Sequence, residues 1–463
     1  MTVHQFESRN ARILAVITAI VVTEAVLALG VFGVAGEPPR GGDSRVYLRM
    51  AESLLNGHGL SAATSPPFDP SAYHPPGYPV FLALVKATAG DNPDAVRVAQ
   101  FGLLILLAML VYSLARETVG TRPAGIAAIT TALYAPFVGF ATAHLAELLG
   151  TVLLAATMLA LVRALESASV RMYVVAGVGL ALVAMTRSAF ALLLIPLALA
   201  ALFDATARRL PYKSLSRYRG TAILVAVFCA VSLPWAARNI AVTDHFIPFA
   251  TNAGESLFLS ARQYSGEMRC APERLVNPEG SGLREPPLSS PSCFLRFSYI
   301  KRLRHLIRTR ISRDHTDGGL ETRIEVTMYY ELRDQAMQVF SGLGLWDIVG
   351  DIPMRERSLW STAAFRFSET GFKIARLQHY LLLTAAIAGA ALLAVRRHAG
   401  YWWILLIPIL YVSVLHLIFH VVPRYSIPTR PFLIILAAYA AWALLAAVGV
   451  RPAVSRLSRR VWH

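Results

Sequence analysis

Six ionisable residues stand in the first long polar segment or where long apolar runs begin and end: Asp43, His74, Glu147, Arg187, Arg238 and Arg424. Charges beside hydrocarbon are costly, so they are usually paired or functional. A carboxylate can act as a general base toward an acceptor, and the planar fork of arginine matches the oxygens of a phosphate group. These residue types suit a reaction in which a phosphate-linked lipid is held while a base activates an acceptor.

The segments between these residues are too apolar for a soluble protein. Of 463 residues, 55% are hydrophobic and 16% are charged, which leaves too little polar surface to cover the apolar atoms. A helix that crosses a bilayer needs about 20 mostly apolar residues. The sequence therefore predicts an all-α polytopic membrane protein with about ten spans. They lie at roughly residues 12–34, 96–115, 123–140, 145–165, 171–186, 188–203, 221–238, 377–395, 401–421 and 427–449.

Basic residues are unevenly distributed among the connections between these spans. If the N-terminus is cytoplasmic, the short inner connections and the C-terminal tail are rich in arginine, whereas the short outer connections hold few, chiefly Arg187, Arg424 and Arg430. Cytoplasmic loops are enriched in Lys and Arg, so both termini are predicted to be cytoplasmic. This topology, with contacts to anionic lipids, accounts for the net charge of +16 without a nucleic-acid partner.

Two outer segments are too long to be simple connections. The predicted organisation is an N-terminal transmembrane catalytic module at 1–240 that includes an outer loop at 36–94, an extracytoplasmic loop at 241–376, and C-terminal transmembrane helices with a short basic tail at 377–463. Apolar residues at helical spacing predict amphipathic helices on the outer surface, at 44–56, from Pro79, at 299–313 and at 320–340. The basic helix at 299–313 lies either at the lipid interface or on a small solvated domain.

The cysteine and histidine patterns predict little chemistry. Cys270 and Cys293 lie 23 positions apart in the second outer segment. In an oxidising compartment they could form a disulfide, worth about 3 kcal/mol in the loop-entropy model. His416 and His420 have helical spacing but no third ligand nearby, so helix packing is favoured over a metal site. The sequence shows no required cofactor and leaves a divalent metal open.

Four short motifs follow one another along the chain: Asp43-Ser-Arg-Val-Tyr47, His74-Pro-Pro-Gly-Tyr78-Pro79, Pro234-Trp-Ala-Ala-Arg238-Asn239 and Arg424-Tyr425-Ser-Ile-Pro428. Together they resemble the membrane glycosyltransferases of the GT-C fold. The group of closest resemblance contains bacterial aminoarabinose–lipid A transferases and dolichyl-phosphate-mannose protein mannosyltransferase-like proteins (glycosyltransferase family 39-like). The resemblance extends over most of the chain and implies a GT-C fold.

The resemblance also implies roles for single residues. Asp43 matches the first-loop aspartate that serves as general base in a one-step inverting displacement, although it could also cap the following helix. His74 stands where relatives usually have Arg or Lys. The contact with the donor phosphate is therefore assigned first to Arg238 and Arg424, with His74 as a weaker candidate. Both arginines could instead anchor headgroups or pair with Glu147.

The remaining candidates have weaker assignments. Glu147 would bind sugar hydroxyls, orient an arginine or form an ordinary bond between helices. Asn239 would cap its helix or contact the substrate. Tyr78 and Tyr425 would be interfacial belt residues or substrate ligands, and Arg187 resembles a family position of unclear role.

The expected activity is transfer of a hexosyl or pentosyl group from a polyprenyl-phosphate donor to a lipid, glycan or protein acceptor. The setting is a bacterial inner membrane, with the active site facing the periplasm and membrane lipids as further partners. The absence of a Gly-rich phosphate cradle after a strand argues against direct use of a nucleotide sugar. Two alternatives remain, a transporter or flippase for a polyprenyl-linked substrate and an inactive GT-C-like scaffold.

Overall fold

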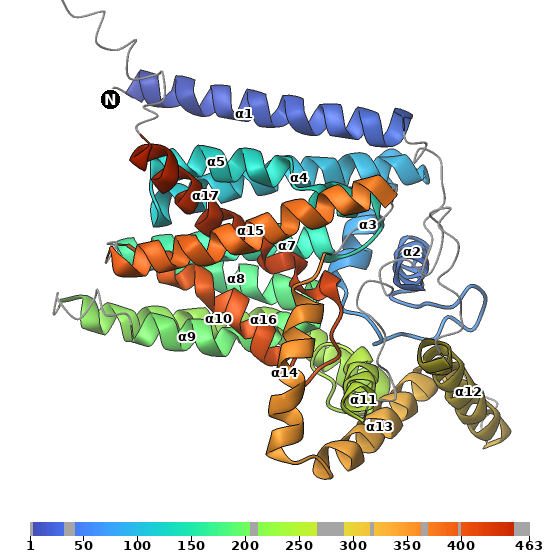
Figure 1. Ribbon diagram of the computed structural model, residues 1–463. Coiled ribbons are helices and arrows are strands. Elements are labelled where there is room, and N and C mark those ends of the chain that lie inside the picture. Colours follow the sequence, from blue (N-terminus) through green and yellow to red (C-terminus); the bar gives the residue numbers. More distant parts are fainter. Residues whose placement is uncertain are drawn as a thin grey trace, which may run out of the picture.

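The chain forms a bundle of long helices with shorter helices gathered at one end (Figure 1). The computed structural model describes residues 3–31, 42–203, 212–265, 291–314, 319–362, 369–396 and 400–448. Every long regular element in these ranges is a helix, which confirms the expected all-α class.

Six helices are long and apolar enough to cross a bilayer. They belong to α1 (Val3–Val26), α4 (Pro93–Thr118), α7 (Glu147–Ser167), α10 (Tyr212–Thr243), α15 (Glu369–Val395) and α17 (Arg430–Ala447). A seventh candidate is the pair α5 (Thr121–Ala132) and α6 (Ala135–Thr142), which is bent by 44°.

Three expected spans coincide with shorter apolar helices. These are α8 (Val170–Thr186), the segment Ser188–Leu202 that ends in α9 (Leu194–Leu202), and the segment Trp402–Leu415 that ends in α16 (Leu406–Leu415). By length alone these helices do not qualify as full spans, so the count of about ten stays a prediction.

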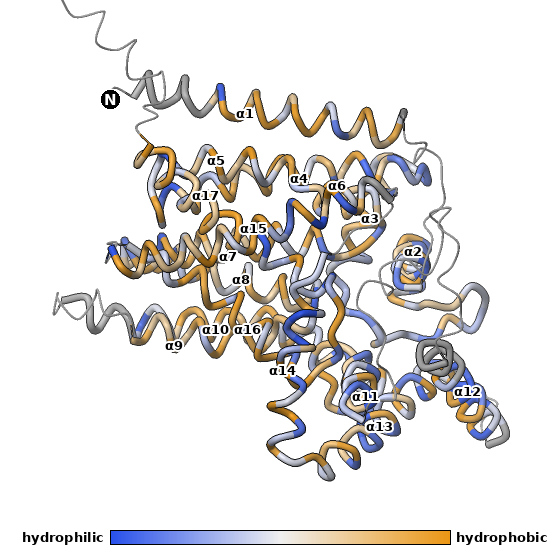
Figure 2. The backbone as a smooth tube through the Cα atoms, in the orientation of Figure 1, coloured by the Kyte–Doolittle hydropathy of each residue, from blue (hydrophilic) through white to orange (hydrophobic). Residues whose placement is uncertain are grey.

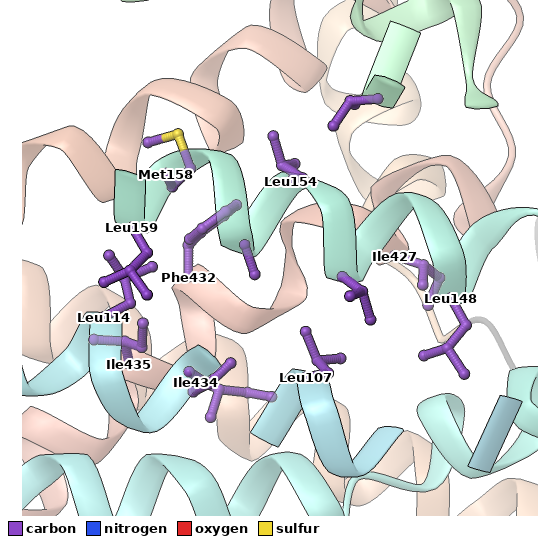
Figure 3. Close-up of a cluster of buried hydrophobic side chains, with 14 of the residues drawn as sticks. Leu107, Leu114, Leu148, Leu154, Met158, Leu159, Ile427, Phe432, Ile434 and Ile435 are labelled. Atoms are coloured by element: carbon purple, nitrogen blue, oxygen red, sulfur yellow. The ribbon is translucent and has the colours of Figure 1, made fainter. Parts of the chain in front are cut away.

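The core of the bundle lies around α7, most of whose apolar window is buried. Figure 3 shows Leu148, Leu154 and Met158 of α7 in one cluster with Leu107 of α4 and Phe432 of α17. Because packing surrounds α7, its position is fixed. The residue that begins α7, Glu147, is therefore held at a defined place at one end of the bundle.

Six further helices gather at that end: α2 (Gly42–Leu55), α3 (Gly77–Ala89), α11 (Asn252–Tyr264), α12 (Pro291–Asp314), α13 (Leu320–Ser341) and α14 (Leu345–Leu359). Helices α2, α3, α12 and α13 match those expected outside the membrane, whereas α11 and α14 have no expected counterpart. Figure 2 shows hydrophilic residues concentrated in this part and apolar ones along the spans.

One contact between spans leaves no room for a side chain. A Cβ added at Gly389 of α15 would lie 1.9 Å from the backbone oxygen of Leu436 in α17. The two helices therefore approach through glycine, as in other membrane bundles where small residues allow close packing.

We expect Gly389→Ala to force α15 and α17 apart and to destabilise the protein by at least about 1–3 kcal/mol, the usual cost of overpacking. The measurement is the melting temperature of the purified protein in detergent. Gly102→Ala in α4 is the matched control, because nothing lies within 4 Å of its added Cβ. Equal melting temperatures for the two variants would contradict the close approach.

Candidate active site

The site is built around one contact between residues 381 positions apart. Nη2 of Arg424 donates to Oδ2 of Asp43 over 2.6 Å. Asp43 lies in the first turn of α2, and Arg424 lies in the short 3-10 helix Pro423–Thr429 that precedes α17. The Asp43 side chain is 32% exposed and that of Arg424 is 26% exposed, so a substrate can reach both.

A second ion pair continues this contact inward. Nη1 of Arg187 lies 2.8 Å from Oε1 of Glu147, and Nε of Arg424 lies 3.8 Å from the same oxygen. Glu147 is buried, and the backbone of Gly150 one turn later leaves room for the Arg187 side chain. Asp43, Arg424, Glu147 and Arg187 thus form one chain of alternating charges, which we call the charge chain.

Two aromatic residues border the charge chain. The guanidinium carbons of Arg187 and Arg424 both lie 5.5 Å from the ring centre of Tyr425, a cation–π distance. His416 meets Tyr425 edge-on at 5.2 Å. His416 is buried, and neither of its ring nitrogens has a hydrogen-bond partner among the described residues. The sequence pattern favours a packing role for His416, but the structure places it beside the site with its hydrogen-bonding capacity unused.

The electrostatics of the site keep Asp43 ionised. Burial alone raises the pKa of this carboxyl, but the charge of Arg424 and its hydrogen bond to Asp43 outweigh burial, and the pKa is lowered to about 2. Asp43 is therefore a carboxylate at every physiological pH, which is the form that a general base requires.

His74 lies next to this site but does not carry a charge at pH 7. It is buried, and its ring centre lies 4.5 Å from that of Tyr47 on α2. Burial lowers its pKa from 6.5 to about 4, although the charge of Asp43 opposes the shift. His74 thus cannot supply the permanent charge that Arg or Lys would bring to this position, and a neutral hydrogen-bonding role fits it better.

Arg238 and Asn239 hold the first outer loop and do not join the charge chain. Nη1 of Arg238 donates to the carbonyl of Ser71 over 2.8 Å and to Oδ1 of Asn239 over 3.0 Å. Asn239 is fully buried and donates to the carbonyl of Ile247 over 2.9 Å. The sequence predicts that both Arg238 and Arg424 contact the phosphate, but in the structure Arg238 is hydrogen-bonded to the backbone of the first outer loop.

Tyr78 also has a structural contact. Its side chain is fully buried, and its hydroxyl donates to Oε1 of Gln100 on α4 over 3.0 Å. Gln100 in turn donates to the carbonyls of Ala141 and Ala143. Tyr78 therefore links α3 to α4, and Gln100 links α4 to the end of α6. Because the side chain of Tyr78 is fully buried, a substrate cannot touch it.

Two acidic residues that sequence reasoning missed fasten the same outer loop to α13. Glu325 accepts from the hydroxyl of Ser71 over 2.8 Å and from the amide of Ala72 over 3.0 Å, and burial raises its pKa. Asp69 accepts from the amides of Gly319 and Glu321 at the start of α13. About 250 residues separate the partners, so no local sequence motif predicts these contacts.

Two expectations about the site stay open. The disulfide between Cys270 and Cys293 lies outside the residues whose side chains the structure describes. Within the described ranges, His, Cys, Asp and Glu side chains form no group of three or more that could hold a metal ion.

Comparisons with known proteins identify the fold. Residues 73–235 match the family model of dolichyl-phosphate-mannose-protein mannosyltransferase. Two structures of the oligosaccharyltransferase of Archaeoglobus fulgidus superpose on the chain. One is the apo form, with a TM-score of 0.58 and 15% sequence identity. The other is AglB in complex with an inhibitory peptide and a dolichol-phosphate, with a TM-score of 0.56 and 14% sequence identity. The chain has the GT-C fold.

Each of these two superpositions covers 97% of this chain and 52% of the other, so the chain spans about half the length of these GT-C proteins. ArnT from Cupriavidus metallidurans, bound to undecaprenyl phosphate, superposes with a TM-score of 0.41 at 13% identity, covering 93% of this chain and 78% of that one. Comparison with curated protein sequences gives no significant match. The superpositions on the two oligosaccharyltransferase structures confirm, at the level of the GT-C fold, the resemblance inferred from the motifs.

The lowered pKa of His74 predicts a pH effect on stability. Between pH 6.5 and 4 the unfolded chain binds a proton on His74 that the folded chain does not, so stability falls as the pH drops through this window. The loss attributable to His74 is on the order of 2 kcal/mol at pH 5. We expect His74→Gln to show a smaller fall in melting temperature from pH 7.5 to pH 5 than the wild type.

The matched control is His58→Gln, because His58 is exposed and lies in the same outer loop. This control should keep the wild-type pH dependence. An unchanged pH dependence in His74→Gln would show that His74 is not buried in its neutral form.

Proposed function

We propose that this GT-C protein is an inverting glycosyltransferase that moves a sugar from a polyprenyl-phosphate donor to a lipid, glycan or protein acceptor at the outer face of the membrane. The observation that carries the proposal is the contact between Asp43 and Arg424. It joins an ionised carboxylate to a guanidinium at 2.6 Å, with both side chains partly exposed. A base and a phosphate-binding group stand together here, as a displacement at a sugar phosphate requires.

In the proposed reaction the acceptor attacks the anomeric carbon of the donor sugar from the side opposite the phosphate. A bond forms between this carbon and the acceptor atom. The bond from the carbon to the phosphate oxygen breaks, and its electron pair leaves with polyprenyl phosphate. Asp43 takes the proton of the acceptor group, and the single displacement inverts the configuration of the anomeric carbon.

Arg424 is the group best placed to stabilise the leaving phosphate. A guanidinium has five N–H donors, so Arg424 can bind phosphate oxygens while it keeps a contact with Asp43. A phosphate that draws Arg424 away from Asp43 would also remove part of the charge that lowers the pKa of this carboxyl to about 2. Donor binding would then make Asp43 a stronger base at the moment when a base is needed.

The other members of the site have supporting roles in this proposal. Glu147 holds Arg187 by the 2.8 Å contact and thereby keeps a second cation beside the phosphate. Tyr425 lies within cation–π distance of both guanidinium groups and helps to hold them beside the phosphate. The unused ring nitrogens of His416 are available for a phosphate oxygen or a sugar hydroxyl.

The comparisons support a polyprenyl-linked donor. The family match at residues 73–235 contains His74, Glu147 and Arg187. The similar oligosaccharyltransferase was solved with an inhibitory peptide and a dolichol-phosphate, and the second of these is a polyprenyl phosphate. For this chain we propose a bacterial inner membrane, with the site facing the periplasm and both termini in the cytoplasm.

Asp43→Asn should reduce transfer roughly 100-fold or more, because an amide cannot accept the proton of the acceptor. The assay follows release of polyprenyl phosphate from labelled polyprenyl-phosphate-mannose and polyprenyl-phosphate-aminoarabinose, with cell-envelope extract as the acceptor. Asp91→Asn is the control, since Asp91 lies in the same outer loop and pairs with Lys86 at the surface. Wild-type release by folded Asp43→Asn protein would remove the proposed mechanism.

Arg424→Lys should change the kinetics of transfer, whereas Arg238→Lys should change the stability of the protein. The first keeps a charge but loses the fork, so we expect the donor KM or kcat to worsen roughly 10-fold or more with little change in melting temperature. The second loosens the hold on Ser71, so we expect a lower melting temperature and a donor KM near that of the wild type. The reverse pattern would move the phosphate contact to Arg238.

A further inference from the structure

α14 exposes an apolar face instead of burying it. Trp346 is 81% exposed, and Val349, Pro353 and Met354 are also exposed. At 100° per residue these four side chains fall on one side of the helix. The opposite side is buried and polar at its centre, where Arg355 is 2% exposed. Leu359, on the same packed side, is 1% exposed, so α14 carries apolar side chains on both its packed and its exposed sides.

The buried side of α14 is fastened to the end of α16. Arg355 donates to the carbonyls of His416 over 3.0 Å and of Phe419 over 3.3 Å. The hydroxyl of Ser413 donates to Glu356 over 2.8 Å. These contacts set the rotation of α14 about its axis, so its apolar face is held outward.

α16 and the turn that follows it also expose apolar side chains on one side, near the end at which α14 is fastened. Leu410, Val414 and Ile418 recur at four-residue spacing on that side, and all three are exposed. Exposed apolar side chains on a helix at membrane depth face lipid. Figure 1 shows α14 running crosswise to the spans. Exposed apolar side chains thus follow α16 toward its end, and α14, which is fastened there, exposes apolar side chains of its own in the crosswise direction.

We propose that α14 is an interfacial helix whose face formed by Trp346, Val349, Pro353 and Met354 lies among the lipids of the outer leaflet. Tryptophan is enriched at this level of a bilayer. Arg357 is exposed at the end of the same face, where its long side chain can reach headgroup phosphates. The occupant of the face is lipid, and no protein partner is required.

This placement has a consequence that rests on the proposed function. The carbonyl of Leu359, the last residue of α14, accepts from the hydroxyl of Ser426 over 2.9 Å. Ser426 lies two residues after Arg424 in the same short helix. A helix held in the outer leaflet thereby sets the depth of Arg424 at the level where the phosphate of a polyprenyl lipid lies.

The test measures the depth of α14 in a bilayer and does not depend on transferase activity. Nitroxide labels are placed on Trp346→Cys and Met354→Cys in the full-length chain, reconstituted in phosphatidylethanolamine and phosphatidylglycerol vesicles. Leu410→Cys on α16 serves as the lipid-facing control and Glu331→Cys on α13 as the water-facing control. The native cysteines are first replaced by serine: Cys229, Cys270 and Cys293. Collision with oxygen, which concentrates in lipid, is compared with collision with a water-soluble nickel chelate.

We expect the labels at 346 and 354 to collide with oxygen as the label at 410 does and to be protected from nickel. Nickel access equal to that at 331 would overturn the proposal. Dipolar coupling between labels at 346 on two chains would overturn it in favour of a dimer face. If the cysteine-free chain does not fold, fluorescence of the native protein with brominated lipids replaces the labels. Quenching must then be weaker in Trp346→Phe than in the wild type, and equal quenching would reject the interfacial helix.

Discussion

The arrangement of this protein depends on the cost of keeping ions beside hydrocarbon. Four charged side chains meet at the end of the bundle, and each of them has an opposite charge as its neighbour in the order Asp43, Arg424, Glu147 and Arg187. Losing one member would leave a partner without compensation, which is far more costly than the pair is favourable. The charge chain therefore fixes the relative positions of α2, α7, the end of α8 and the start of α17.

Chemistry and scaffolding are divided between two sets of polar residues. The charge chain keeps Asp43 and Arg424 partly exposed, so these groups remain available to a substrate. A second set, which includes Arg238, Glu325 and Asp69, forms hydrogen bonds with backbone groups of the first outer loop and of the start of α13. The second set thus holds the first outer loop and α13, while the charge chain joins α2 to the helices of the bundle.

The helical fold follows from the sequence for a general reason. Lipid offers no hydrogen bonds to the backbone, so apolar runs of sufficient length must form helices. The motifs also located Asp43, Glu147 and Arg424 where the structure brings them together. Helix α14 was beyond such reasoning, because its exposed apolar face has a meaning only once Arg355 is seen to bind α16.

The sequence alone determined the types of the charged residues that border the apolar segments and the helical period of those segments. It could not determine which arginine meets Asp43, because Arg238 and Arg424 have the same chemistry and similar positions relative to their spans. The tertiary structure decided this, because Arg238 donates to a loop carbonyl whereas Arg424 donates to Asp43 of α2. A contact across 381 residues depends on how every intervening helix packs, and no local pattern carries that information.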